Sequence, residues 1–408
     1  MKTFIRNQIV APLFEQMVVK LIKRNNLTVI AVAGSVGKTT TKTAIASVLG
    51  VKHRVLAHQG NYNSQLGMPL SIFELEAPDN ILNAFGWLKL YLDARRIAAD
   101  HYPYEVVVLE LGTDHPGEIA AFAYLKPQIG IITAIAPEHM ENFTDLEAVA
   151  DEEFELARYA KKIVLNDSFD QLKIRASGLS NVSWYGSQSN SFSSTKSYPN
   201  HIRQALSAAI VVATELGLTE SQIKTGLAIF TPAPGRMVRL EGVKGCSLID
   251  DTYNSSPIAI KAALETLSES KGRQIAVLGQ MNELGEQSAA YHREVGSECA
   301  KLDLLVTLVG DANQFLGPAA VEAGLDTSKW KAFDSPYSAG KWLRSKIELG
   351  DTILIKGSQT GVCAEEVTKL LLANPADAKR LVRQSPTWLK RKASQFEVQK
   401  SEYELYPA

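Results

Sequence analysis

The stretch LTVIAVAGSVGKTTTKTAIASVL, residues 27–49, decides the fold of the first half of the chain. Its first residues are apolar and rich in β-branched types, which predicts a buried strand. Glycines at 34 and 37 then interrupt the run, and a helical stretch follows at once. A strand that leads through a glycine loop into a helix offers backbone N–H groups and a positive helix end to an anion. We therefore expect a phosphate-binding loop, with Lys38 at the terminal phosphates and the Thr39 hydroxyl on Mg²⁺.

Similar apolar runs alternate with helical stretches on both sides of TPAPGR (231–236). Unbroken apolar runs separated by helices predict parallel strands that are covered on both faces. The runs are EVVVLELG (105–112), IGIITAIA (129–136), KKIVLN (161–166), CSLIDD (246–251), RQIAVLG (273–279), LLVTLVG (304–310) and DTILIKG (351–357). TPAPGR itself, with two prolines and a glycine, predicts a domain linker. We expect an α/β chain with an amphipathic helix over 1–26, a P-loop parallel-sheet ATPase domain over 27–231 and a Rossmann-like α/β domain over 232–408.

The composition is that of a soluble globular protein. Apolar residues make up 45% of the 408 residues and charged residues 21%, which excludes a disordered chain. Lys and Arg number 43 against 44 Asp and Glu, so the charge does not favour nucleic acid as a partner. No apolar run is long enough to span a membrane. Cys246, Cys299 and Cys363 are far apart and form no CxxC, which excludes a disulfide scaffold and fits a cytoplasmic protein.

Three segments outside the strands also carry expectations. One stripe of an amphipathic helix that ends at Asn25–Asn26 is formed by Ile9, Leu13, Met17 and Leu21, with Val10, Phe14, Val18 and Ile22 beside them. We expect this helix to pack on the domain that follows, with a basic membrane-surface helix as the alternative. Another helix is expected to end at Leu216, where Gly217 can cap it. LKRK (389–392) is expected to be a solvated patch.

Residues able to do chemistry follow several of these strands. Glu110 and His139 each come after an apolar run, where a charge gains nothing from packing. A carboxylate beside a triphosphate requires a divalent cation between them, so Glu110 suits Mg²⁺; a lone histidine suits a structural hydrogen bond as well as a metal. Arg236 in the linker can bind phosphate, and Asp251 at a strand end can accept from ribose hydroxyls. From spacing alone, a linker salt bridge and a helix cap explain these two equally well.

In order and in kind, these segments resemble the Mur ligase family, and within it the branch that adds D-alanyl-D-alanine. The resemblance covers about 330 residues and is carried by GSVGKTTTK (34–42), GNYNSQLGMPL (60–70), LELGTDHPGEIA (109–120), TAIAPEHMENF (133–143), PGRM (234–237), LIDDTYNSSP (248–257), VLGQMNELGEQS (277–288) and IKGSQ (355–359). IDDTYNSSP and LGQMNELGE are more specific to that branch than the phosphate loop is.

The resemblance implies a cytoplasmic, monomeric ATP-dependent amide ligase of peptidoglycan precursor synthesis. Its substrates are small molecules, a muramoyl-peptide carboxylate and D-alanyl-D-alanine, joined through an acyl phosphate with ATP and Mg²⁺. The implied catalytic residues are Lys38, His139 and Glu153. The implied ATP-binding residues are Gly34, Ser35, Gly37, Lys38, Thr39, Thr40, Gln204, Arg236, Asp251 and Asn254. The implied metal ligands are Thr39, Glu110, His139 and Glu153, and the implied substrate-binding residues are Asn61, Asn63 and Ser358.

The sequence also departs from the family pattern. About 26 residues precede the first strand, too few for the family's uridine diphosphate-binding domain, so the nucleotide part of the donor is expected to add little affinity. Glu153 stands where the family carbamylates a lysine, Gln204 where it has an adenine-facing asparagine, and Gln359 where it has an arginine. These departures leave two alternatives: a ligase of another carboxylate and amine, or a nucleotide-binding homologue without catalysis. The segment 81–103 is expected to be a packed surface helix, with coverage of the donor as its alternative.

Overall fold

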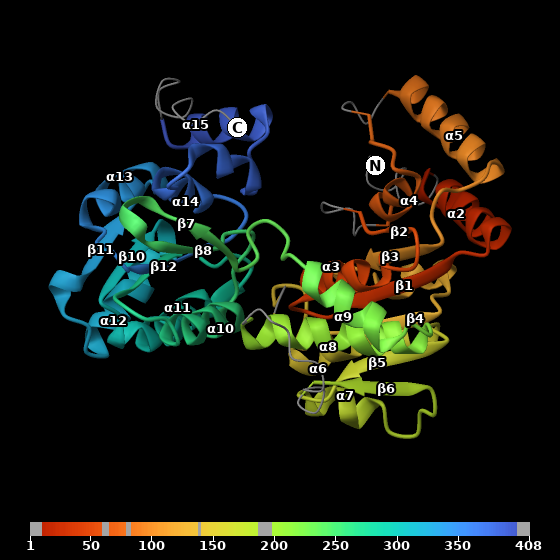
Figure 1. The fold of residues 1–408 in the computed structure, drawn as a ribbon, viewed down its shortest axis with the longest axis horizontal. Coiled ribbons are helices and arrows are strands. Elements are labelled where there is room, and N and C mark those ends of the chain that lie inside the picture. Colours follow the sequence, from red (N-terminus) through yellow and green to blue (C-terminus); the bar gives the residue numbers. More distant parts are fainter. Residues whose placement is uncertain (1–9, 59–64, 79–82, 138–139, 187–197, 398–408) are drawn as a thin grey trace. The chain divides into compact units, whose positions relative to one another are not determined.

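The computed structural model divides the chain into two compact units, residues 1–231 and 232–408. It describes residues 10–58, 65–78, 83–137, 140–186 and 198–397. Each unit is built on one sheet of six strands (Figure 1). The mixed α/β architecture expected from the alternating apolar runs is confirmed for both units.

The sheet of the first unit is parallel throughout, with strand order β2-β3-β1-β4-β5-β6. The four predicted strands are confirmed and form its centre. The edge strands β2 and β6 were not predicted, since the first is very short and the second is half exposed. The strands are β1 (Thr28–Ala33), β2 (Val55–Leu56), β3 (Val106–Glu110), β4 (Ile129–Ile132), β5 (Lys162–Asn166) and β6 (Val182–Tyr185).

Helices cover this sheet because its strands are apolar on both faces. Helices α3, α8 and α9 pack together on one side, and α3 begins directly after the glycine loop (Figure 1). Helix α8 ends at Glu215 with Gly217 at φ +71°, as the predicted cap requires. The α-helices of the unit are α2 (Ala11–Asn25), α3 (Lys38–Leu49), α4 (Gly67–Phe73), α5 (Ala84–Ala99), α6 (Leu146–Phe154), α7 (Asp170–Arg175), α8 (Asn200–Glu215) and α9 (Glu220–Ile229).

The first helix packs on the unit as predicted. Helix α2 buries Phe14, Met17, Val18 and Leu21, whereas Leu13 is 44% exposed. Its buried face thus combines two residues of the predicted stripe, Met17 and Leu21, with Phe14 and Val18 beside them. Apolar residues occur on both sides of that line, and only the contacts with α4 and α5 decide which side is buried.

The sheet of the second unit has the order β11-β10-β9-β12-β8-β7, and only β7 runs antiparallel. Its four predicted strands are confirmed, while the edge strands β7 and β11 were not predicted. Along β7 buried and exposed residues alternate, so it lacks the continuous apolar run of a central strand. The strands are β7 (Val238–Glu241), β8 (Ser247–Asp251), β9 (Gln274–Gly279), β10 (Leu304–Leu308), β11 (Trp330–Phe333) and β12 (Thr352–Lys356).

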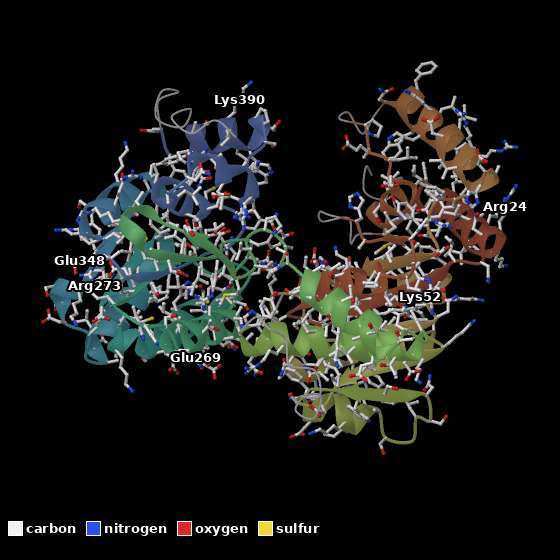
Figure 2. The ribbon with its side chains drawn as sticks, in the orientation of Figure 1. Arg24, Lys52, Glu269, Arg273, Glu348 and Lys390 are labelled. Atoms are coloured by element: carbon white, nitrogen blue, oxygen red, sulfur yellow. The ribbon has the colours of Figure 1, made fainter. Side chains whose placement is uncertain are left out.

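Helices α10, α11 and α12 cover one face of this sheet, and α13 and α14 the other (Figure 1). Figure 2 shows Arg273 and Glu348 together at the margin of the unit, where their side chains lie 3.2 Å apart. The α-helices are α10 (Pro257–Ser268), α11 (Ser288–Glu298), α12 (Gly317–Glu322), α13 (Pro336–Lys346), α14 (Glu365–Leu371) and α15 (Pro386–Gln395).

The three cysteines are free and buried. Among the described residues, no helix has both the length and the apolar character needed to cross a bilayer.

Candidate active site

The loop between β1 and α3 is tightly seated against the end of β4. Gly34 has φ +116°, and a Cβ there would lie 2.3 Å from Thr133 Oγ1, so the position requires glycine. The Ser35 N–H donates to the Ala134 carbonyl at 2.8 Å, and the Ser35 hydroxyl accepts from the Ala136 N–H at 3.0 Å. Since β4 lies next to β1 in the sheet, its end fixes the shape of the predicted phosphate loop.

The first turn of α3 brings together two residues predicted to share a metal. The Thr39 hydroxyl lies 3.0 Å from each carboxylate oxygen of Glu110, which ends the neighbouring strand β3. The Lys38 ammonium bends back over the loop and donates to the carbonyls of Gly34 and Ser35. Lys38, Thr39 and Glu110 therefore lie around one loop that can receive phosphate.

Lys42, one turn further along α3, was not singled out from the sequence. It is almost fully buried, lies 3.1 Å from Glu110 Oε2 and donates to the His58 carbonyl at 2.9 Å. This ion pair orients the Glu110 carboxylate and offsets its charge. Thr40, also predicted to bind ATP, is buried in the same turn. A lysine one turn after the loop lysine, on the same helix face, is the sequence signal for Lys42.

Glu153 reaches the phosphate loop from α6. It is fully buried, and its Oε2 accepts from the Gly34 N–H at 2.6 Å. Its other oxygen, Oε1, has no hydrogen-bond partner among the described residues. Burial raises the pKa of this carboxyl, against the opposing effects of the Lys38 ammonium and the Gly34 N–H. A buried oxygen without a protein partner, at the edge of a phosphate loop, is suited to a cation or its water.

The adjacent Glu152 points to a different part of the unit. Its two oxygens accept from the backbone N–H groups of Gly117 and Ile119, each at 2.7 Å. Neighbouring helix residues are about 100° apart, so one carboxylate faces the loop and the other does not. Glu152 therefore anchors the segment after β3, and Glu153 is the carboxylate at the phosphate loop.

Several predicted ligands fall outside the described residues. His139, Asn61 and Asn63 all do so, and their roles stay predictions. Within the part of the chain that the structure describes, no three His, Cys, Asp or Glu side chains converge on one point. Mg²⁺ in nucleotide sites is commonly held by one or two carboxylates, water and phosphate oxygens. The hydroxyl and carboxylate oxygens of Thr39, Glu110 and Glu153 fit that pattern.

Gln204 lies in the first turns of α8, next to the end of β5. Its Oε1 accepts weakly from Asn166 Nδ2 at 3.5 Å, and its Nε2 donates to the Ser168 hydroxyl at 3.4 Å. The side chain is thus at the carboxyl edge of the same sheet as the phosphate loop. An adenine contact from this position stays a prediction.

In the second unit the predicted residues gather at the carboxyl ends of β8 and β12. Asp251 Oδ2 accepts from the Lys356 ammonium at 2.6 Å, and its Oδ1 accepts from the Met237 N–H. Lys356 also donates to the Asn254 carbonyl at 3.0 Å. Burial lowers the pKa of Lys356, an effect that the Asp251 carboxylate opposes. The Arg236 guanidinium lies 4.1 Å from the centre of the Tyr253 ring.

Ser358 follows β12 in the same unit and is buried. Its hydroxyl accepts from the Asn282 N–H at 2.9 Å, and its own N–H donates to the Gln280 carbonyl. Ser358 therefore joins the ends of β12 and β9. Contact with a substrate stays a prediction for this residue.

Comparison with known proteins agrees with this geometry. Residues 32–226 match the sequence model of the Mur ligase middle domain, and residues 235–359 match that of the Mur ligase glutamate ligase domain. Together the two matches cover most of the chain. It belongs to the Mur ligase family.

Two curated relatives of this Mur ligase have the same name. The UDP-N-acetylmuramoyl-tripeptide–D-alanyl-D-alanine ligase of Synechocystis is 29% identical over 86% of this chain and 76% of its own length. That of Bacillus subtilis is 28% identical over 85% and 76%. Among solved structures, the ligase MurF of Thermotoga maritima in complex with ADP has a TM-score of 0.70 and 25% identity, over 88% of this chain and 83% of its own. MurF of Acinetobacter baumannii has a TM-score of 0.72 at 24% identity, over 90% and 79%, and shows the fold.

A network of buried charges lies beyond the matched residues of this Mur ligase, and it corrects one prediction. Lys392, placed in a solvated patch by the sequence, is fully buried, and its ammonium lies 2.7 Å from Glu365 and 2.6 Å from Glu366. The prediction was wrong because a buried lysine resembles its exposed neighbours in sequence. Only the pair of glutamates that begins α14 identifies it.

Arg383 connects the same network to the loop after β8. Its guanidinium donates to both oxygens of Glu365, at 2.9 and 2.6 Å, and to the carbonyls of Thr252 and Tyr253. Burial would raise the pKa of Glu365, but Arg383 and Lys392 hold it below its usual range. The segment after residue 359 therefore holds in place the loop that follows Asp251 and carries Asn254.

Arg383→Met is expected to destabilise the second unit by about 3–5 kcal/mol, because it leaves a buried carboxylate short of a partner. The measurement is the free energy of unfolding in urea, followed by fluorescence. Arg380→Met is the matched control: Arg380 is exposed and lies 3.4 Å from Asp377, a surface pair worth less than about 1 kcal/mol. Equal small effects of the two substitutions would contradict a structural role for Arg383.

Proposed function

We propose that this Mur ligase is an ATP-dependent amide ligase that joins D-alanyl-D-alanine to the carboxylate of a muramoyl tripeptide. The proposal is supported by the curated relatives and by the cluster of Lys38, Thr39 and Glu110 at the phosphate loop. The γ-phosphoryl group of ATP passes to the donor carboxylate, which gives an acyl phosphate and ADP. The amine of the dipeptide then attacks the acyl carbon, loses a proton and releases inorganic phosphate.

The chemical difficulty of this reaction is negative charge. Two anions, a triphosphate and a carboxylate, have to come within reaction distance. Catalysis therefore depends on cations and hydrogen-bond donors that are already in position. We assign Lys38 and the loop glycines to the terminal phosphates, and Arg236 and Asp251 to the phosphates and ribose. Lys38 already donates to carbonyls of the loop, so its ammonium needs little reorganisation to reach phosphate.

We assign Mg²⁺ to Thr39 and Glu110, with Glu153 at a second position that His139 shares. When bound, the metal neutralises phosphate charge and polarises the transferred group. Lys42 holds Glu110 from the other side, and the Gly34 N–H holds one oxygen of Glu153. Both carboxylates are thus oriented by the protein before a cation arrives.

A substrate screen for ADP release tests the proposal. UDP-muramoyl-tripeptide, lipid-linked muropeptide and free muropeptide are each supplied with ATP and Mg²⁺, with and without D-alanyl-D-alanine. We expect ADP release to require both a carboxylate and the dipeptide. ADP release with another carboxylate or amine would change the substrates that we assign but leave the proposed mechanism unchanged. ATP binding without release in every combination would favour a nucleotide-binding homologue.

The acceptor is expected to be the dipeptide and not a single amino acid. TYNSSP and QMNELGE follow the D-alanyl-D-alanine branch, and a site built for a second amide leaves polar groups unpaired when a shorter amine binds. We expect D-alanyl-D-alanine to exceed alanine, glutamate or lysine in kcat/KM by as much as about 10⁴-fold. Initial rates of ADP release at saturating donor measure this. A faster rate with one of the single amino acids would assign the chain to another branch of the family.

We further propose that the enzyme is a cytoplasmic monomer. Its three free, buried cysteines suit a reducing compartment. Light scattering with size-exclusion chromatography measures the mass, which is 44.6 kDa for one chain.

A further inference from the structure

One face of helix α5 exposes large apolar side chains to solvent. Its exposed positions recur three or four residues apart and so form one stripe along the helix. Phe85 is 85% exposed, Leu88 55% and Leu92 52%. The other exposed residues of the stripe are Lys89, Arg95, Arg96 and Ala99. Single exposed apolar residues are normal, but three in consecutive turns of one stripe form a patch.

The opposite face of α5 already fixes the helix on the unit. Leu90 and Ala94 are buried in the core that α2 shares. The rings of Trp87 and Tyr91 meet Phe14 of α2 edge-to-face, each with centroids 6.5 Å apart. The helix is therefore anchored by one apolar face while a second faces solvent.

Helices α2 and α5 lie together with the same direction (Figure 1). Phe14, near the start of α2, meets the first turns of α5, and Asn25, at its end, accepts from the Tyr102 N–H just beyond α5 at 3.1 Å. The exposed Leu13 is thus at the same end of the pair as Phe85 and Leu88. Arg24, which Figure 2 shows at the edge of the unit, is at the same end as Arg95 and Arg96.

Within the bounds of α2 and α5 the exposed charges all have one sign, and the exposed Asp100 directly follows α5. Every charged residue at an exposed position of the two helices is basic: Lys20, Lys23, Arg24, Lys89, Arg95 and Arg96. The acidic residues of the same helices, Glu15 and Asp93, are half-buried, and Glu15 accepts from Gln65. Since the whole chain carries a formal charge of only −1, this is a local concentration of positive charge.

We propose that α2 and α5 together form a docking surface for an anionic lipid bilayer. The side chains of Phe85, Leu88 and Leu92 would enter the boundary between headgroups and acyl chains, while the basic residues would lie among the lipid phosphates. A second copy of the chain fits less well, because two such faces would repel each other. Nucleic acid also fits less well, because its phosphates would pair with the basic residues but leave the three apolar side chains in water. The proposal does not depend on the ligase activity.

Vesicle flotation of the full chain, without nucleotide or substrate, tests this. We expect the protein to float with vesicles of phosphatidylglycerol and phosphatidylcholine, to stay behind with phosphatidylcholine alone, and to be released as ionic strength rises. The triple variant F85S/L88S/L92S and the charge variant R95E/R96E should each lower the partition coefficient by roughly tenfold or more. Leu349→Ser, at another 85% exposed apolar residue, is the matched control and should bind like the wild type.

Circular dichroism and urea unfolding show that each variant is folded, and the exposed positions make this the expected result. Failure to float with anionic vesicles would overturn the proposal, and so would binding that neither variant changes. Concentration-dependent dimers that the triple variant abolishes would assign the surface to a second copy instead. Because no turnover is measured, failure of the ligase screen would leave these results unaffected.

Discussion

Lys38→Ala is expected to lower ADP release by at least about 10²–10³-fold while the protein stays folded. The Lys38 ammonium is the cation that the phosphate loop itself carries, and it donates to the carbonyls of Gly34 and Ser35 in that loop. Alanine removes the charge but no core packing, because the side chain lies over the loop. Initial rates at saturating ATP, with circular dichroism of the same sample, measure both parts of the prediction.

Lys52→Ala is the matched control for this experiment. Lys52 lies just beyond the end of α3, and Figure 2 shows it at the surface of the same unit. Its ammonium donates to the Gly217 carbonyl at an exposed position, so its loss should leave the rate nearly unchanged. Turnover by Lys38→Ala at the wild-type rate would remove the phosphate loop from the mechanism.

The centre of each sheet was predictable because its strands are buried on both faces. Such strands leave continuous apolar runs in the sequence, as IGIITAIA does for β4. Edge strands leave no such run: in β7 the exposed Arg239 and Glu241 alternate with buried residues, and β2 is only two residues long. That α2 buries Phe14 but exposes Leu13 depends on helix partners distant in sequence, which no local pattern encodes.

The candidate site was predictable where chemistry and strand order coincide. Thr39 and Glu110 are 71 residues apart in sequence. Thr39 lies just after β1 and Glu110 ends the neighbouring strand β3, so the carboxyl edge of the sheet brings them together. Arg383 and Lys392 were not predictable in the same way. In the sequence, buried charged residues look the same as exposed ones, and only their contacts in the folded structure distinguish the two.

The last prediction separates the two neighbouring glutamates of α6. Glu153→Gln keeps the shape of the side chain and an oxygen for the Gly34 N–H, but it removes the charge beside the phosphate loop. We expect the Mg²⁺ concentration for half-maximal activity to rise on the order of 10- to 100-fold, with a smaller change in KM for ATP. The free energy of unfolding should not fall, since the substitution removes a buried charge whose desolvation is unfavourable. Added bicarbonate should change nothing, because a glutamate needs no CO₂.

Glu152→Gln should behave in the opposite way. Both of its carboxylate oxygens accept from backbone N–H groups, at Gly117 and Ile119, and an amide can offer only one oxygen. The variant should lose about 1–3 kcal/mol of stability, the cost of a buried donor left without an acceptor, and keep its Mg²⁺ dependence. A fully active Glu153→Gln beside a Glu152→Gln that has lost its response to Mg²⁺ would transfer the metal role to Glu152. The contact between Glu153 and Gly34 would then serve only to hold the loop. A metal ligand is identified by the effect of its charge on the Mg²⁺ dependence of activity, and proximity alone does not identify one.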